Sequence, residues 1–143
     1  MRLEQPEPLI IVAPTTLTGL HQRTVIVRSS DFELAGVIQG SLDIGDGVVA
    51  RIVGKQQGST SIAPRAELTI SGALEGSVYI SPRASVIVEA GGKLAGSVAN
   101  DGTLTIRGVF GGAYSGSGEI MLEGSGCIKN PRIENGIYIY DWS

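Results

Sequence analysis

The chain has 143 residues, 42% of them hydrophobic, and carries a net charge of −3. This length is typical of one domain, and 21 glycines with only 5% aromatic residues indicate a narrow aliphatic core with tight corners. With 14 acidic against 11 basic residues, the sequence lacks the basic surface of a nucleic-acid binder, so nucleic acid is not expected as a partner.

The first part of the chain, residues 1–19, is predicted to be an extended lead-in, because it lacks the repeat described below and contains three prolines. Within it, the apolar run 8–14 is interpreted as a short edge strand, and weak membrane binding is the alternative. The N-terminal residues do not show a basic start followed by a long apolar run, so no signal peptide is predicted. No apolar stretch approaches the roughly 20 residues that cross a bilayer.

The repeating part, residues 20–134, is predicted to form its first strand at residues 24–28. A six-residue register places apolar residues inward from there, and Gln56 is its first polar member. We expect residues 54–59 to form a corner loop. The predicted inward residues of this part are Ile26, Phe32, Ile38, Ile44 and Ala50.

The clearest repeat lies between residues 62 and 110, where every sixth residue is apolar except Gly92 and a small residue follows four positions later. A period of six fits neither a helix nor a plain two-residue alternation. It does fit a coil with three flat faces, in which each face takes about six residues. The apolar steps are Ile62, Leu68, Leu74, Ile80, Val86, Val98, Leu104 and Phe110.

Three such faces give a turn of about 18 residues, and this longer period is visible directly. Residues 63–70 recur as 81–88 and, more loosely, as 99–106. We therefore predict an all-β fold, a single-stranded parallel β-helix (β-solenoid) with a triangular cross-section and about six coils. This prediction requires Leu68, Val86 and Leu104 to stack one above the next.

The last segment, residues 135–143, changes character, because it contains two of the four tyrosines and the only tryptophan. The final coil of a solenoid exposes apolar core and unpaired strand edges, which must be covered or used. Tyr138, Tyr140 and Trp142 are therefore predicted either to cap that end or to contact a partner.

Residues with catalytic or metal-binding chemistry are sparse, so no catalytic residue, metal or cofactor is predicted. His21 is the only histidine, and an acyltransferase that uses it as a base is the weakest of our hypotheses. Asp43 and Asp46 lack the later acidic ligands of a calcium loop. Cys127 is the only cysteine, which excludes an intrachain disulfide, and no neighbouring charge or base activates its thiol.

Two related stretches carry a family resemblance. Leu-x-Gly-Ser-Val-x-Ile-x-Pro-x-Ala-x-Val-x-Val spans residues 74–88, and Leu-x-Gly-Ser-Val-x-Asn-x-Gly-x-Leu-x-Ile spans 94–106. This region resembles the bactofilin domain of polymer-forming bacterial cytoskeletal proteins. The resemblance implies a right-handed β-helix that assembles end to end, without nucleotide, into non-polar filaments in the cytoplasm at the inner face of the membrane. The aromatic segment 137–142 departs from the family, and if it folds over the last coil it would block stacking.

The leading hypothesis is a non-enzymatic structural protein whose main partner is another copy of itself, a homo-oligomer or filament joined through the solenoid ends. The residues predicted for self-association are Ile26 and Phe32 at one end and Leu122 and Ile128 at the other. The alternative is a capped protein-binding module, for example an immunity or adaptor protein, that uses a flat face and the aromatic tail.

Overall fold

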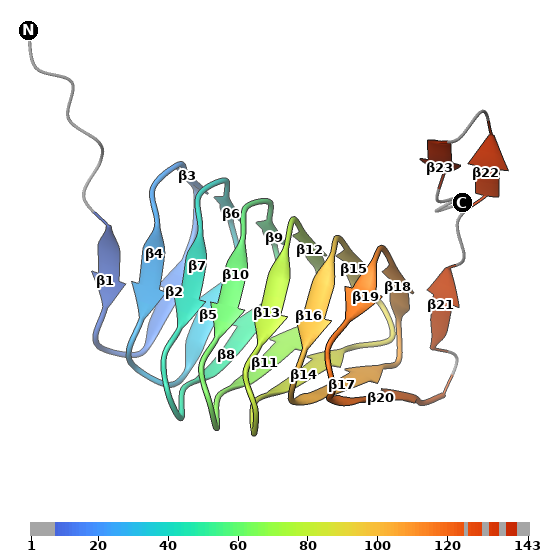
Figure 1. The fold of residues 1–143 in the computed structure, drawn as a ribbon. Helices are drawn as coiled ribbons and strands as arrows, with labels where there is room; N and C mark the ends of the chain where they lie inside the picture. The colour runs from blue at the N-terminus through green and yellow to red at the C-terminus, as the bar shows by residue number, and fades with distance from the viewer. Residues whose placement is uncertain (1–7, 125, 130–131, 135–136, 140–143) are drawn as a thin grey trace, which may run out of the picture.

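The computed structural model describes residues 8–124, 126–129, 132–134 and 137–139. In these residues the regular structure is all β-strand, and three parallel sheets of seven strands each form a solenoid (Figure 1). The chain passes from sheet A to B to C and then returns to A, so every third strand belongs to the same sheet. The predicted triangular β-solenoid is confirmed.

The strands of each sheet are as follows. Sheet A contains β1 (Leu9–Ile11), β4 (Val25–Val27), β7 (Leu42–Ile44), β10 (Thr60–Ile62), β13 (Val78–Ile80), β16 (Val98–Asn100) and β19 (Tyr114–Ser115). Sheet B contains β2 (Thr15–Leu17), β5 (Phe32–Leu34), β8 (Val49–Ile52), β11 (Glu67–Ile70), β14 (Ser85–Val88), β17 (Thr103–Ile106) and β20 (Glu119–Leu122). Sheet C contains β3 (Leu20–His21), β6 (Val37–Ile38), β9 (Lys55–Gln56), β12 (Ala73–Glu75), β15 (Lys93–Ala95), β18 (Val109–Gly111) and β21 (Cys127–Lys129). The remaining strands, β22 (Arg132–Glu134) and β23 (Ile137–Ile139), pair antiparallel with each other.

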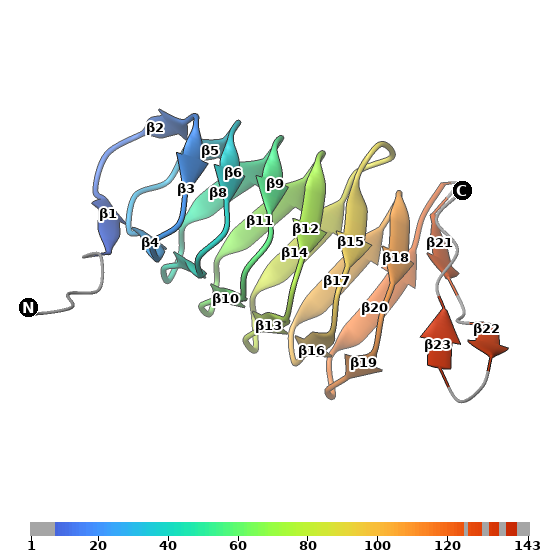
Figure 2. The same cartoon turned by 90° about the horizontal axis from the view of Figure 1, so that it is seen from above.

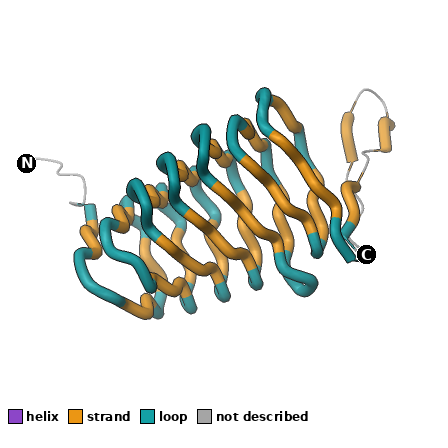
Figure 3. The backbone as a smooth tube through the Cα atoms, turned by 90° about the horizontal axis from the view of Figure 1, so that it is seen from below, coloured by secondary structure: helices purple, strands orange, loops and turns teal. Residues whose placement is uncertain are grey.

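The coils stack in register, with short strands joined by corner loops (Figures 2 and 3). Six full turns separate β1 from β19, and β20 and β21 continue the last layer. Leu68 pairs with Val86, which pairs with Leu104, and all three are buried. Burial of one such aliphatic side chain stabilises the fold by about 1.5–3 kcal/mol, so these internal columns are the main source of stability.

The start of the solenoid differs from the prediction. β1 pairs with β4 and β2 pairs with β5, so residues 9–19 already belong to the first coil rather than to a lead-in. The prolines here are compatible with strands because they fall outside the three-residue segments that pair. The first turns are also shorter than 18 residues: Leu9 pairs with Val25, and Val25 with Leu42.

Ile26 does not point inward as predicted. Its neighbours Val25 and Val27 are fully buried, whereas Ile26 is half-buried on the outer face of sheet A. Phe32 comes five positions after Val27, whereas Ala50, which pairs with Phe32 in the following coil, comes six positions after Ile44. A shift of one residue exchanges the inner and outer faces of a strand. Asp31, with a φ of 64°, lies in this shortened corner.

Gln56 lies in a strand rather than in a bulging corner loop. It pairs in sheet C between Ile38 and Leu74 and is fully buried. Its amide nitrogen donates hydrogen bonds to the carbonyl oxygens of Gly40 and Ser59, each at 3.1 Å. Among the described residues, its side-chain oxygen Oε1 has no hydrogen-bond partner, so the core column satisfies only the nitrogen of this amide.

Glycines allow the coils to approach one another closely at the corners, most regularly between sheets B and C and between sheets C and A. A Cβ atom added at Gly54 would lie 2.1 Å from the carbonyl oxygen of Gly36 in the preceding coil, and one at Gly58 would lie 2.2 Å from that of Gly40. No real Cβ atom tolerates such a contact with backbone. Gly54 and Gly58 are therefore required for space, whereas Gly76, at the same corner as Gly58 one coil later, also has a φ of 82°.

One coil is longer than its neighbours. Leu74 pairs with Leu94, twenty residues later, whereas Val86 pairs with Leu104, eighteen residues later. The additional residues lie in the turn after β14, where the Gly92 N–H donates a hydrogen bond of 2.7 Å to the Glu89 carbonyl. The corner absorbs them without disturbing the stack.

Candidate interaction surfaces at the ends of the solenoid

The C-terminal end exposes residues that continue the core columns. Ile120 pairs with Leu104, and Leu122 with Ile106, so both occupy inward positions of β20. Among the residues that the structure describes, no further strand of sheet B covers them: Leu122 is 54% exposed, and the neighbouring Met121 is 41% exposed. This end therefore presents apolar side chains together with the free edge of β20.

On the sheet A side of the same end, Tyr114 covers the column below it. It pairs with Val98 and places its ring edge-on against Phe110, with ring centres 6.2 Å apart. Its hydroxyl accepts a 3.0 Å hydrogen bond from the side-chain amide of buried Asn100, which also donates to the Glu119 carbonyl at 2.9 Å. Asn100 thus anchors the last coil, while the sheet B side stays open.

The N-terminal end has a different character. Leu9 and Leu17 occupy inward positions and are half-buried, whereas Leu20 on the outside of sheet C is 59% exposed. In sheet C the inward position belongs to His21, which pairs with Ile38. The His21 Nε2 lies 2.7 Å from the Thr18 carbonyl. The inward column of sheet C therefore ends, on the N-terminal side, in the polar imidazole ring of His21.

The predicted self-association residues are placed unequally. Leu122 lies at the C-terminal end as expected, and Ile128 lies in β21, which pairs with β18 at the same end. Ile26 faces outward on β4, and Phe32 is 2% exposed because β2 covers it. Neither lies at the N-terminal end, so that part of the prediction is corrected.

Sequence reasoning missed the residues that do form the N-terminal end, namely Leu9, Leu17 and Leu20. The signal that could have found them is the apolar run 9–13 followed by Leu17 and Leu20. It is hidden from a search for a fixed six-residue step because the first coil is short. Of the predicted tail residues, Tyr138 lies in β23, where it pairs with Ile133, and Tyr140 and Trp142 lie outside the described residues.

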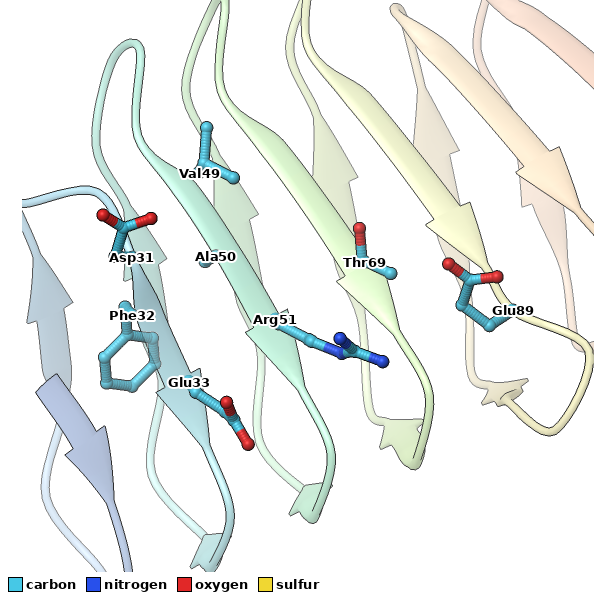
Figure 4. Close-up of a pocket in the computed structure, with 8 residues that line it drawn as sticks. All are labelled: Asp31, Phe32, Glu33, Val49, Ala50, Arg51, Thr69 and Glu89. Atoms are coloured by element: carbon cyan, nitrogen blue, oxygen red, sulfur yellow. The ribbon is translucent and has the colours of Figure 1, made fainter. Parts of the chain in front are cut away.

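Surface hollows lie on the flat faces of sheets A and B in the described part of the chain. The one on sheet B, of about 380 Å³ (Figure 4), is lined by Asp31, Phe32, Glu33, Val49, Ala50, Arg51, Thr69 and Glu89. Arg51 points across it and donates to the Ser71 hydroxyl at 3.1 Å. The hollow on sheet A, of about 460 Å³, is largely apolar and includes Ile26, Pro64 and Tyr79.

Ion pairs connect neighbouring coils on the outside. The Arg65 guanidinium donates hydrogen bonds to both carboxylate oxygens of Asp46, which lies in the preceding coil. This hydrogen bonding lowers the pKa of Asp46. Arg107 lies between Glu123, at 2.9 Å, and Glu89, at 3.7 Å, and the pKa of Arg107 is raised, chiefly by its hydrogen bond to Glu123. These exposed pairs align the coils but add little stability.

Comparison with known proteins gives no assignment: no family model matches the sequence, and no match appears among curated proteins or solved structures. Within the described ranges, no three His, Cys, Asp or Glu side chains cluster as a metal site would require. The same residues include no helix with the length and apolar character to cross a membrane.

Proposed function

We propose that this protein is a non-enzymatic structural protein that associates with further copies of itself through the ends of its solenoid, as in a bactofilin-like cytoplasmic scaffold or filament. The observation that carries the proposal is the uncovered last rung of sheet B, where Leu122 is in a core position yet 54% exposed. Exposed core positions next to a free strand edge favour pairing with another chain.

The chemistry of this end suits another copy of the chain. The exposed edge of the last coil can pair with a further strand at about 4.8 Å, the same spacing at which the protein's own coils stack. A charge at Leu122 would have to be buried on association, which is costly, whereas in the free protein it would stay near water. The substitution Leu122→Asp is therefore expected to weaken association more than folding.

The test compares wild type, Leu122→Asp and the control Ser59→Asp, which adds the same charge at an exposed corner position in the middle of the solenoid. Light scattering after size-exclusion chromatography should give a mass above that of one chain for wild type and the control, and the mass of one chain for Leu122→Asp. Circular dichroism checks that all three are folded. A wild-type protein that remains monomeric at the highest soluble concentration would contradict the proposal.

A second candidate is a protein-binding module, and the apolar hollow on sheet A favours it. Tyr79 is 43% exposed there and lies beside Pro64 and Ile26, an arrangement that could accept an apolar segment of another protein. The same mass measurement separates the two functions, because a capped module stays monomeric and is unaffected by Leu122→Asp. Neither proposed function involves membrane association through residues 8–14.

A further inference from the structure

The outer face of sheet A carries two rows of side chains that run from coil to coil. The first row is formed by outward residues that pair from one strand to the next. The second row lies two residues later, where each backbone N–H donates a hydrogen bond to the preceding coil. The first row is Ile10, Ile26, Asp43, Ser61, Tyr79, Ala99 and Ser115, and the second, from the coil of β4 to that of β16, is Arg28, Gly45, Ala63, Ser81 and Asp101.

The largely apolar hollow of about 460 Å³ lies within these two rows. Its lining includes the small side chains of Gly45, Ser61 and Ala63, with Ile26 on the N-terminal side and Tyr79 on the C-terminal side. Tyr79 is 43% exposed. One face thus places an exposed aromatic ring beside an open hollow.

The first row is complementary to itself when it is read in reverse about β10. A second copy related by a two-fold axis parallel to the strands, between the two faces, opposes sheet A with its own sheet A and runs in the opposite direction. With the axis at Ser61, Ile26 of each copy lies opposite Ala99 of the other, and Tyr79 lies opposite Asp43 in the hollow. Each of these large side chains therefore meets a smaller one, as close packing of two sheets requires. The Tyr79 hydroxyl can also donate a hydrogen bond to the Asp43 carboxylate.

The second row adds complementary charge to the same arrangement. Arg28 of each copy lies opposite Asp101 of the other, so one contact contains this ion pair twice. Arg28 is exposed and, within the part of the chain that the structure describes, has no hydrogen-bond or ion-pair partner. A shift of one coil would set Arg28 opposite Ser81, or Asp101 opposite Gly45. The charges therefore favour a single register.

The area of this contact is small. The seven strands of sheet A, at a spacing of about 4.8 Å, span about 30 Å, and their width of three residues is about 10 Å. Two such faces together bury about 600 Å², whereas stable specific interfaces bury about 1,200–2,000 Å². Two isolated chains are therefore not expected to stay paired through sheet A, in agreement with the single-chain mass expected for Leu122→Asp.

Copies that join end to end repeat the contact. Where each sheet continues into the next copy, the sheet A faces of successive copies form one row, and each contact holds the next one near its partner. We propose that sheet A is the face through which two end-to-end assemblies of this protein pair side by side, running in opposite directions, with Tyr79 of each copy in the hollow of the other. This inference rests on the proposed function, and it assigns the hollow to another copy of the chain rather than to a different protein.

The test exchanges the two charges of the second row. Arg28→Glu sets two carboxylates opposite each other and should halve the mass per unit length of the filaments, measured by scanning transmission electron microscopy. Combining Arg28→Glu with Asp101→Arg restores opposite charges and should restore the wild-type value. The matched control, Arg51→Glu, makes the same charge reversal on the outside of sheet B, where Arg51 donates to the Ser71 hydroxyl, and should keep the wild-type value.

Tyr79→Ser provides a test that leaves the charges in place. It removes the ring from the hollow and should also halve the mass per unit length, even if Asp101→Arg disturbs the corner where Asp101 accepts a hydrogen bond from the Ser117 N–H at 3.1 Å. Wild-type filaments that are one solenoid wide would overturn this inference alone, as would Arg28→Glu or Tyr79→Ser filaments with the wild-type mass per unit length. A wild-type protein that remains monomeric would overturn the proposed function and this inference with it.

Discussion

Gly72→Ala tests the claim that glycine is required where the coils stack. The added Cβ atom would lie 2.1 Å from the Gly54 carbonyl oxygen and 2.2 Å from that of Val53. Both are backbone atoms of the preceding coil, so relief requires the coils to move apart. Overpacking typically costs about 1–3 kcal/mol, and we expect the upper end, about 3 kcal/mol, because no flexible side chain can yield. With an unfolding entropy of about 2.1 cal/mol/K per residue, the melting temperature should fall by about 10 °C.

The matched control is Gly91→Ala. Gly91 has nothing within 4 Å of the added atom and no left-handed φ, so this variant should retain wild-type stability or gain up to about 1 kcal/mol through the unfolded chain. Because both substitutions are glycine to alanine, the unfolded-state effects cancel in the comparison. Thermal and urea unfolding followed by circular dichroism gives the difference. If the two variants agree within about 0.5 kcal/mol, the steric account of the glycine columns is refuted.

Three further substitutions probe other parts of the structure. Thr60→Val should raise the urea midpoint by an amount equivalent to about 1 kcal/mol, because the Thr60 hydroxyl is buried without a hydrogen bond to the protein; the same change at half-exposed Thr69 should have no effect. Asn100→Ala should speed amide exchange in β20 at least tenfold and leave β11 unchanged, since Asn100 holds the last coil; equal acceleration in both strands would contradict this role. Arg65→Ala should raise the pKa of Asp46 in an NMR titration. The depressed carboxyl pKa means that any stability from this pair is present above the unfolded pKa and is lost as pH falls through the folded one, and an unchanged pKa would show that the pair does not form in solution.

The regular middle of the fold was predictable because Leu68, Val86 and Leu104 report the coil period directly. The first two coils were not, since they are shorter: Val27 and Phe32 in the second coil are one residue closer than the pattern requires, and this reverses the inward face at Ile26. Gln56 was misplaced for another reason. Polarity indicated a loop, but two backbone carbonyls accept hydrogen bonds from its side-chain nitrogen inside the core.

The candidate site was predictable only at one end. Leu122 follows the register to the last rung, so its exposure could be inferred from where the repeat stops. At the other end the register had already failed, and Phe32 was taken as terminal although a complete coil precedes it.

The long turn after β14 has a practical consequence. Two additional residues there leave the pairing of β14 with β17 intact, and Gly91 projects into open space. Foreign peptides grafted between Ala90 and Gly91 should therefore be displayed on the outside of a rigid rod, with the scaffold beneath them unchanged. A loop closure of this kind becomes only slowly more costly as the insert lengthens.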